Sequence, residues 1–96
     1  MTTDRTQAIE ALLSATEAAH GVYETTALGG VFDEDWAEWY AAYAVEHGID
    51  DLVGHPVTAG QVERFLVSTF AEFKRLDPKA TEEWAAWTAR RVAADL

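Results

Sequence analysis

The segment from Asp33 to His47 constrains the fold more than any other part of the chain, because it concentrates aromatic residues at helical spacing. It reads D-E-D-W-A-E-W-Y-A-A-Y-A-V-E-H and holds two of the four tryptophans and two of the three tyrosines. On a helix, five rings fall within an arc of about 100°: Trp36, Trp39, Tyr40, Tyr43 and His47. We therefore expect a helix over residues 33–47, with Asp33 as its N-cap and this aromatic arc facing the core.

Three other segments also have helical spacing. Residues 4–27 carry an apolar stripe that includes Ile9, Leu13 and His20, and Gly29-Gly30 ends this segment. Residues 58–76 begin with Thr58 and Gln61, the pattern of a capping box. The sequence therefore predicts an all-α fold, a bundle of four helices at about 4–27, 33–47, 58–76 and 78–95 within a single domain spanning residues 1–96.

The connections between these helices are short. About five residues join the first two helices, which favours an antiparallel pair. Residues 49–57 are expected to form a loop, with a short helical turn possible at 50–53. The last helix is expected to start at Pro78 or at Thr81. Arg91 falls between two tryptophans of this helix, so we expect it to extend along the rings or to pair with a carboxylate.

Composition narrows the classes of function. The chain has 96 residues, no cysteine and a net charge of −10. Residues 1–57 hold eleven acids and one base, so a nucleic-acid partner and an anionic membrane surface are not expected. No apolar run is long enough to span a membrane, and the first residues lack a signal-peptide pattern. We expect a cytoplasmic protein.

A cluster of polar and aromatic residues is the best candidate for a ligand site. It comprises residues expected at the interface of the first two helices: His20, Tyr23, Glu24, Trp36, Tyr40 and Tyr43. Such a pocket could hold a small molecule, and a cation would suit it because aromatic faces attract positive charge. The alternative is that these rings are simply packed core.

Metal and catalytic sites have weaker support in the sequence. Glu17 and His20 have the i, i+3 spacing found in di-iron bundles, but no second such pair exists. A triad of His20, His47 and His55 is an alternative, although the expected heights of the first two differ. No nucleophile motif or phosphate loop is visible. We therefore predict no metal site and no catalytic residue, leave the cofactor unknown, and leave enzymatic activity open, since no catalytic motif indicates it.

The pattern H-x-x-Y-E at His20–Glu24, followed by W-x-x-W-Y-A-x-Y at Trp36–Tyr43, resembles a group of small, acidic, Ala-rich bacterial proteins without assigned activity. The resemblance extends over most of the chain. It implies a helical fold and a bacterial source, for which actinobacteria are the expected group, and it supplies no functional residues.

Two functions follow from these observations. The first is a protein-interaction module that forms a homo-oligomer, such as a homodimer, or binds another protein, because tryptophan is enriched at interface hot spots. The second is a bundle that binds a small molecule or metal in the aromatic pocket, with catalysis as a further option. A cavity with the candidate residues inside it would favour the second function over the first.

Overall fold

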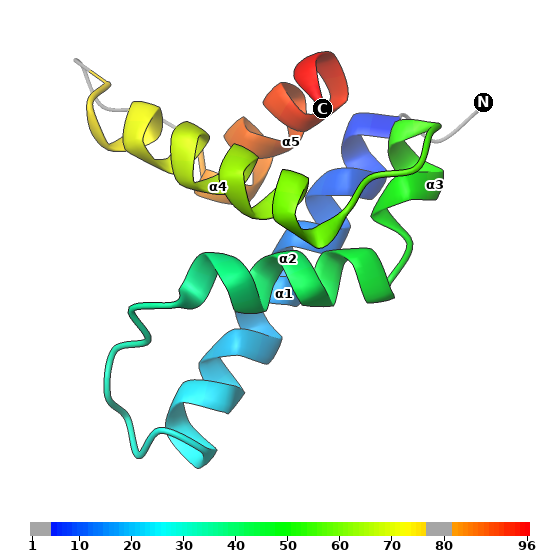
Figure 1. The fold of residues 1–96 in the computed structure, drawn as a ribbon. Coiled ribbons are helices and arrows are strands. Elements are labelled where there is room, and N and C mark those ends of the chain that lie inside the picture. Colours follow the sequence, from blue (N-terminus) through cyan, green and yellow to red (C-terminus); the bar gives the residue numbers. More distant parts are fainter. Residues whose placement is uncertain (1–4, 77–81) are drawn as a thin grey trace.

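The computed structural model describes residues 5–76 and 82–96, and over these ranges it is built from helices without any strand (Figure 1). The helices are α1 (Arg5–Thr26), α2 (Trp36–Glu46), α3 (Ile49–Val53), α4 (Ala59–Lys74) and α5 (Trp84–Asp95). The prediction of an all-α bundle is confirmed. None of the described helices has both the length and the apolar character needed to cross a bilayer.

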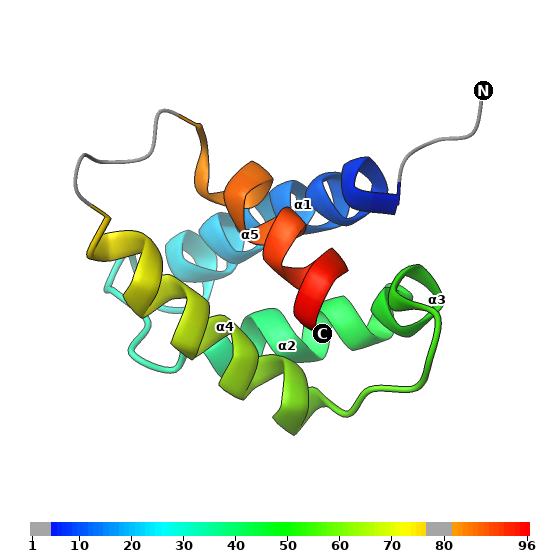
Figure 2. The same cartoon turned by 90° about the horizontal axis from the view of Figure 1, so that it is seen from above.

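The main packing partners are helices that lie far apart in the sequence. The most extensive contacts join α1 to α5 and α2 to α4, whereas α1 and α2 touch over a shorter stretch. Figures 1 and 2 show α2 and α4 lying side by side. The short link between α1 and α2 therefore joins the two packed pairs and does not itself create the largest interface.

The core lies where these helices meet. In α1 the expected stripe is buried, with Ile9, Leu13, Thr16 and His20 inside. Helices α4 and α5 contribute the shorter side chains of Val62, Leu66, Ala85, Ala89 and Val92. These residues form one continuous apolar cluster with α3, because Ile49 and Val53 pack into it.

Helix α2 turns a different face to the core from the one predicted. Its buried residues are the alanines at positions 37, 41 and 44, while the aromatic side chains are only partly buried and His47 is exposed. An alanine side chain adds little bulk, so it fits where helix backbones come close in a densely packed interior. The larger rings lie together on one side of this alanine face, because helical spacing places all of them within an arc of about 100°.

The start of α2 also differs from the prediction. Asp33 is not the N-cap: Asp35 occupies that position without a side-chain capping bond, and the helix begins at Trp36. The Asp33 carboxylate instead accepts a hydrogen bond from the backbone N–H of Asp35 through Oδ1, at 2.9 Å. Its other oxygen faces His20, and this second contact holds Asp33 away from the helix start.

The remaining boundaries need smaller corrections. Helix α1 ends at Thr26, one residue earlier than predicted, and α4 ends at Lys74 and not at residue 76. The capping box at Thr58 is confirmed, with both of its hydrogen bonds formed. The expected loop at 49–57 contains the short helix α3. Asp4, where the first helix was expected to start, lies outside the described residues.

The last helix is shorter than the predicted 78–95. Residues 82 and 83 are not helical, and Glu83 stands at the N-cap position of α5. The two predicted starting points, Pro78 and Thr81, lie outside the described residues. A helix starting at either of them would have to be continuous through residues 82 and 83, so the prediction is wrong for this end of the helix.

Arg91 connects α4 to α5 and satisfies both expectations from the sequence. Its Nη1 donates to Glu72 Oε1 at 3.0 Å, and its Nε donates to Asp95 Oδ2 at 3.1 Å. The guanidinium also lies over the Trp87 ring, 5.5 Å from its centroid. The side chain therefore runs along a tryptophan and ends on two carboxylates.

Candidate functional site

A buried histidine links the end of α1 to the segment before α2. His20 Nε2 lies 2.8 Å from Asp33 Oδ2, and both residues are buried. A carboxylate only accepts hydrogen bonds, so the imidazole donates from Nε2. This hydrogen bond lowers the pKa of the Asp33 carboxyl below its usual value of 3.8, because it stabilises the charged form.

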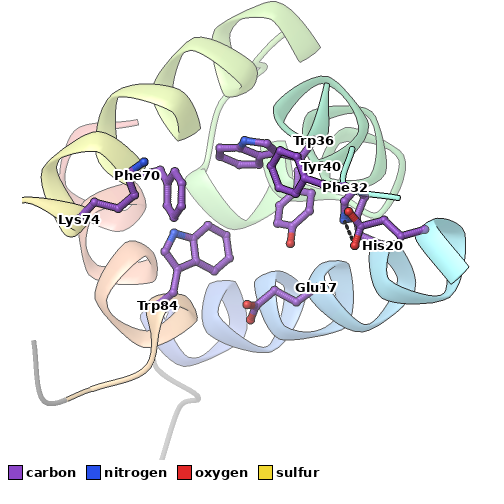
Figure 3. Close-up of a pocket in the computed structure, with 9 residues that line it drawn as sticks. Glu17, His20, Phe32, Trp36, Tyr40, Phe70, Lys74 and Trp84 are labelled. Atoms are coloured by element: carbon purple, nitrogen blue, oxygen red, sulfur yellow. Dashed lines mark ion pairs between the residues drawn. The ribbon is translucent and has the colours of Figure 1, made fainter. Parts of the chain in front are cut away.

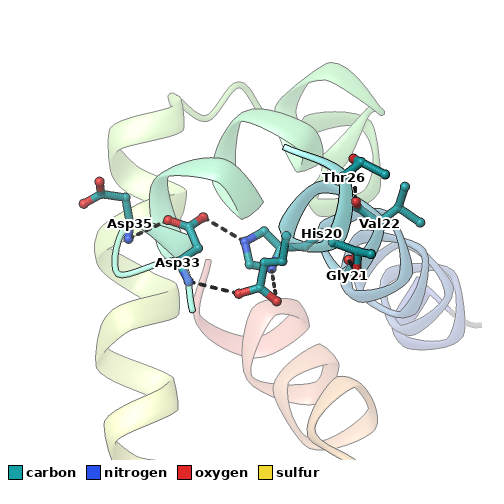
Figure 4. A network of polar contacts seen from close by, with 8 residues as sticks. His20, Gly21, Val22, Thr26, Asp33 and Asp35 are labelled. Carbon is teal, nitrogen blue, oxygen red and sulfur yellow. Dashed lines mark hydrogen bonds and ion pairs between the residues drawn. The ribbon is translucent and has the colours of Figure 1, made fainter. Parts of the chain in front are cut away.

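Glu24 completes this network from the next turn of α1. Its Oε2 accepts a hydrogen bond from the backbone N–H of Asp33 at 3.0 Å, and its Oε1 lies 3.9 Å from His20 Nδ1 (Figure 4). Both nitrogens of the imidazole therefore face carboxylates. The network fixes the segment between α1 and α2 to the α1 surface, and it places Phe32, the neighbour of Asp33, beside a cavity.

The cavity has a volume of about 500 Å³ and lies among α1, α2, α4 and α5 (Figure 3). Its aromatic lining consists of Phe32, Trp36, Tyr40, Phe70 and Trp84. Neighbouring rings meet edge to face: Trp36 and Phe70 have centroids 5.1 Å apart, and Tyr40 and Trp84 have centroids 5.7 Å apart. Ligand pockets commonly have volumes in the range of about 300–1,000 Å³, so the cavity is large enough for a small organic molecule.

The polar lining is predominantly acidic. Glu17, His20 and Glu24 contribute from α1, and Lys74 contributes from the end of α4. Glu17 is exposed as a whole, but partial burial raises the pKa of its carboxyl above the usual value of 4.5, and the neighbouring charge of Glu83 adds to this rise. Burial likewise raises the pKa of Tyr40 to about 12, with further contributions from Glu17 and Glu24. The phenol is therefore neutral at physiological pH and can donate a hydrogen bond.

Two buried polar atoms have no hydrogen-bond partner among the described residues. They are the indole nitrogen of Trp84, which lines the cavity, and the hydroxyl of Thr88, one turn later in α5. Most buried polar groups in proteins are paired, so each of these atoms lowers stability. The unpaired N–H of Trp84 therefore belongs to a side chain that lines the cavity.

The structure brings four of the six predicted site residues to this cavity: His20, Glu24, Trp36 and Tyr40. The other two, Tyr23 of α1 and Tyr43 of α2, are outside the cavity lining and pack against Trp39. Tyr23 stacks on Trp39, with centroids 5.4 Å apart, and Tyr43 stacks on the same ring at 5.5 Å. His47 extends this series of stacked rings, because its imidazole stacks on Tyr43 with ring centroids 3.8 Å apart.

Several site residues were missed from the sequence. Phe70 and Trp84 fell on predicted inward faces, but the crossing that brings them to Tyr40 cannot be derived from helical spacing. Glu17 was considered only as a metal ligand, and Asp33 only as a helix cap. The pairing of Asp33 with His20 did have a signal in the sequence. His20 falls on the apolar stripe of the first helix, and Asp33 is an acid in the link that follows this helix.

The histidines of the alternative metal triad have separate roles. His47 Nδ1 lies 2.8 Å from the backbone oxygen of Tyr43, and His55 Nε2 lies 2.8 Å from the backbone oxygen of Leu96. Within residues 5–76 and 82–96, no three His, Cys, Asp or Glu side chains are grouped so that they could hold a metal ion.

Comparison of the chain with protein-family models, with curated proteins and with solved structures finds no match. The function is therefore argued from the geometry of the cavity and its lining.

Proposed function

We propose that this protein binds a small organic molecule in the aromatic cavity among α1, α2, α4 and α5. The observation that carries the proposal is a cavity of about 500 Å³ walled by five aromatic rings. Small-molecule sites are typically concave and mostly apolar, with a small number of polar groups that orient the ligand. This cavity combines an aromatic wall with the polar side chains of Glu17, His20 and Glu24, so it fits that description.

The lining residues are accessible from solvent. Trp36, Tyr40, Phe70 and Trp84 are each partly exposed, and Phe32 is 69% exposed at the edge. A ligand can therefore enter without unfolding of the core. Binding suits the site better than catalysis, because His20 is buried and its Nε2 donates to Asp33, which leaves little of the imidazole accessible to a bound molecule.

A thermal-shift screen with cationic, neutral and anionic fragments tests this proposal. A ligand at about 100 times its dissociation constant stabilises the folded state by roughly 2.7 kcal/mol. For a chain of this size the melting temperature then rises on the order of 10 °C. The proposal is refuted if no fragment binds with a dissociation constant below about 1 mM, a weak but measurable affinity.

A matched pair of variants on α4 identifies the binding site. Phe70 lines the cavity, whereas Phe73 packs against Trp87 away from it, with centroids 5.3 Å apart. Both side chains are partly buried, so Phe70→Ala and Phe73→Ala both lower stability. Only Phe70→Ala should abolish the ligand-dependent shift. Equal shifts in the two variants would show that the ligand binds elsewhere.

Self-association is the second proposed function, and exposed apolar side chains support it. Val22, Val31, Phe32 and Val67 are all more than half exposed, and none of the four tryptophans is fully buried. Light scattering at high micromolar concentration should then give a mass twice that of one chain, and the double variant Val22→Ser, Val31→Ser should reduce it. A monomer under these conditions contradicts this proposal. Cytoplasmic localisation and a bacterial source stay predictions.

A further inference from the structure

We infer that the ligand is an organic cation, an amine or quaternary ammonium compound whose apolar part packs on the aromatic rings and whose charged group lies against Glu17. This inference rests on the proposed binding function and specifies the chemistry of its ligand. It follows from three features of the lining: an acid without a cationic partner, the position of the single lysine, and the aromatic faces.

The first feature is the carboxylate of Glu17. Glu24 is engaged by the backbone N–H of Asp33, and Asp33 is engaged by His20. Glu17 has no hydrogen bond or ion pair with any described residue, and the neighbouring charge of another acid, Glu83, contributes to its raised pKa. A cationic ligand would supply the charge that the described part of the chain does not place next to Glu17.

The second feature is the position of Lys74. Its side chain is exposed, and its ammonium lies 5.0 Å from the centroid of the Phe70 ring. Figure 3 shows Lys74 at the edge of the lining, with Phe70 between it and the side of the cavity where Glu17 and Tyr40 lie. It therefore does not neutralise Glu17, and an anionic ligand near Lys74 would still share the cavity with two carboxylates.

The third feature is the chemistry of the walls. The face of an aromatic ring carries partial negative charge and attracts cations, most strongly for tryptophan. Trp36, Tyr40 and Trp84 present a large polarizable surface around the space next to Glu17 (Figure 3). A small inorganic cation would need several oxygen or nitrogen ligands, and no such group exists among the described residues. An ammonium group with an apolar body fits both parts of the lining.

Three probes with the same aromatic body and different charges test the inference: 2-phenylethylammonium, 2-phenylethanol and phenylacetate. Their dissociation constants can be measured at pH 7 by tryptophan fluorescence and checked by NMR. We expect the cation to bind roughly tenfold more tightly than the alcohol. A ratio of this size lies between the effects measured for exposed and for buried ion pairs. Phenylacetate should bind most weakly, and about 0.5 M salt should reduce the differences.

Substitutions on α1 test the role of Glu17. Glu17→Gln should reduce the preference for the cation over the alcohol to near unity. Glu10→Gln is the matched control, because Glu10 lies on α1 about two turns earlier and does not line the cavity. Glu17→Asp should restore part of the preference.

The outcomes separate this inference from the proposed function. Equal binding of the three probes, or a preference for phenylacetate, overturns the inference and leaves a binding site for neutral or acidic molecules. A cation preference that survives in Glu17→Gln also overturns it, because the charge would then be recognised elsewhere. If none of the probes binds, and the fragment screen also gives no ligand, the inference and the proposed function both fail.

Discussion

Replacing Thr88 with valine should stabilise the protein, although Thr88 is a fully buried residue in the middle of α5. Its hydroxyl has no hydrogen-bond partner among the described residues, and its exposed fraction is 0%. A buried polar group left unpaired costs about 1–3 kcal/mol. Valine has nearly the same shape and similar helix propensity, so Thr88→Val removes this cost without creating a cavity.

Thr16 provides the control for Thr88. Both threonines are fully buried in helices, but the hydroxyl of Thr16 has a hydrogen-bond partner and that of Thr88 has none among the described residues. The Thr16 hydroxyl donates to the backbone oxygen of Leu12 at 2.7 Å. Thr16→Val loses this bond, which has a net value of about 0.5–1.5 kcal/mol. We therefore expect opposite signs for the two substitutions, with Thr88→Val stabilising by about 1 kcal/mol and Thr16→Val destabilising by a similar amount.

Thermal unfolding followed by circular dichroism measures the difference. A change of 1 kcal/mol shifts the melting temperature by about 4–8 °C in a domain of this size. The two variants should therefore differ by roughly 10 °C in the order Thr88→Val, wild type, Thr16→Val. If Thr88→Val lowers the melting temperature as much as Thr16→Val does, the hydroxyl of Thr88 is satisfied in solution and the reasoning is refuted.

Three further predictions concern charged and polar groups. His20 holds the pKa of Asp33 low, so this pair stabilises the fold above pH 3.8 and the stabilisation is lost as pH falls below that value; Asp33→Asn should be less stable than wild type at pH 6, with a gap that narrows in melts at pH 3. The pKa of Tyr40 is raised from 10.0 to about 12, so its protonated form stabilises the fold below pH 10 and this is lost toward pH 12; Tyr40→Phe should flatten that alkaline loss, and an unchanged profile would contradict the shift. Arg91→Met should lower the melting temperature by a few degrees through loss of its bond to Glu72, whereas an unchanged value would show that this bridge between α4 and α5 contributes nothing.

The parts of the fold that the sequence predicted well are those governed by local rules. The buried stripe of α1 follows from helical spacing, and the start of α4 follows from the paired hydrogen bonds of Thr58 and Gln61. These features depend on residues a few positions apart in the chain. Gly48, which follows the C-cap of α2, has φ of 90°, the left-handed conformation that glycine adopts readily at the end of a helix.

The errors lie where contacts between distant segments decide the outcome. The rings of α2 were assigned to the core because they are large and apolar, but the close approach of neighbouring helices selected Ala41 and Ala44 for the interior. Asp33 had the sequence context of a helix cap, but its carboxylate accepts a hydrogen bond from His20 instead. The cavity was anticipated between the first two helices, yet Phe70 and Trp84 on α4 and α5 form much of its wall. Helical spacing specifies a face, and the partner of that face depends on the crossing of the helices.

The alanine face of α2 has a consequence for how this protein can change over evolutionary time. Trp36 and Tyr40 line the cavity, while Trp39 and Tyr43 stack on each other on the same helix and do not line it. The buried alanines of α2 do not line the cavity either, but their size determines how deeply the helix sits. A single added methyl group there would move both sets of rings together. Mutations at these alanines can therefore change the size of ligand that the cavity accepts, although the alanines are not among the residues that line it.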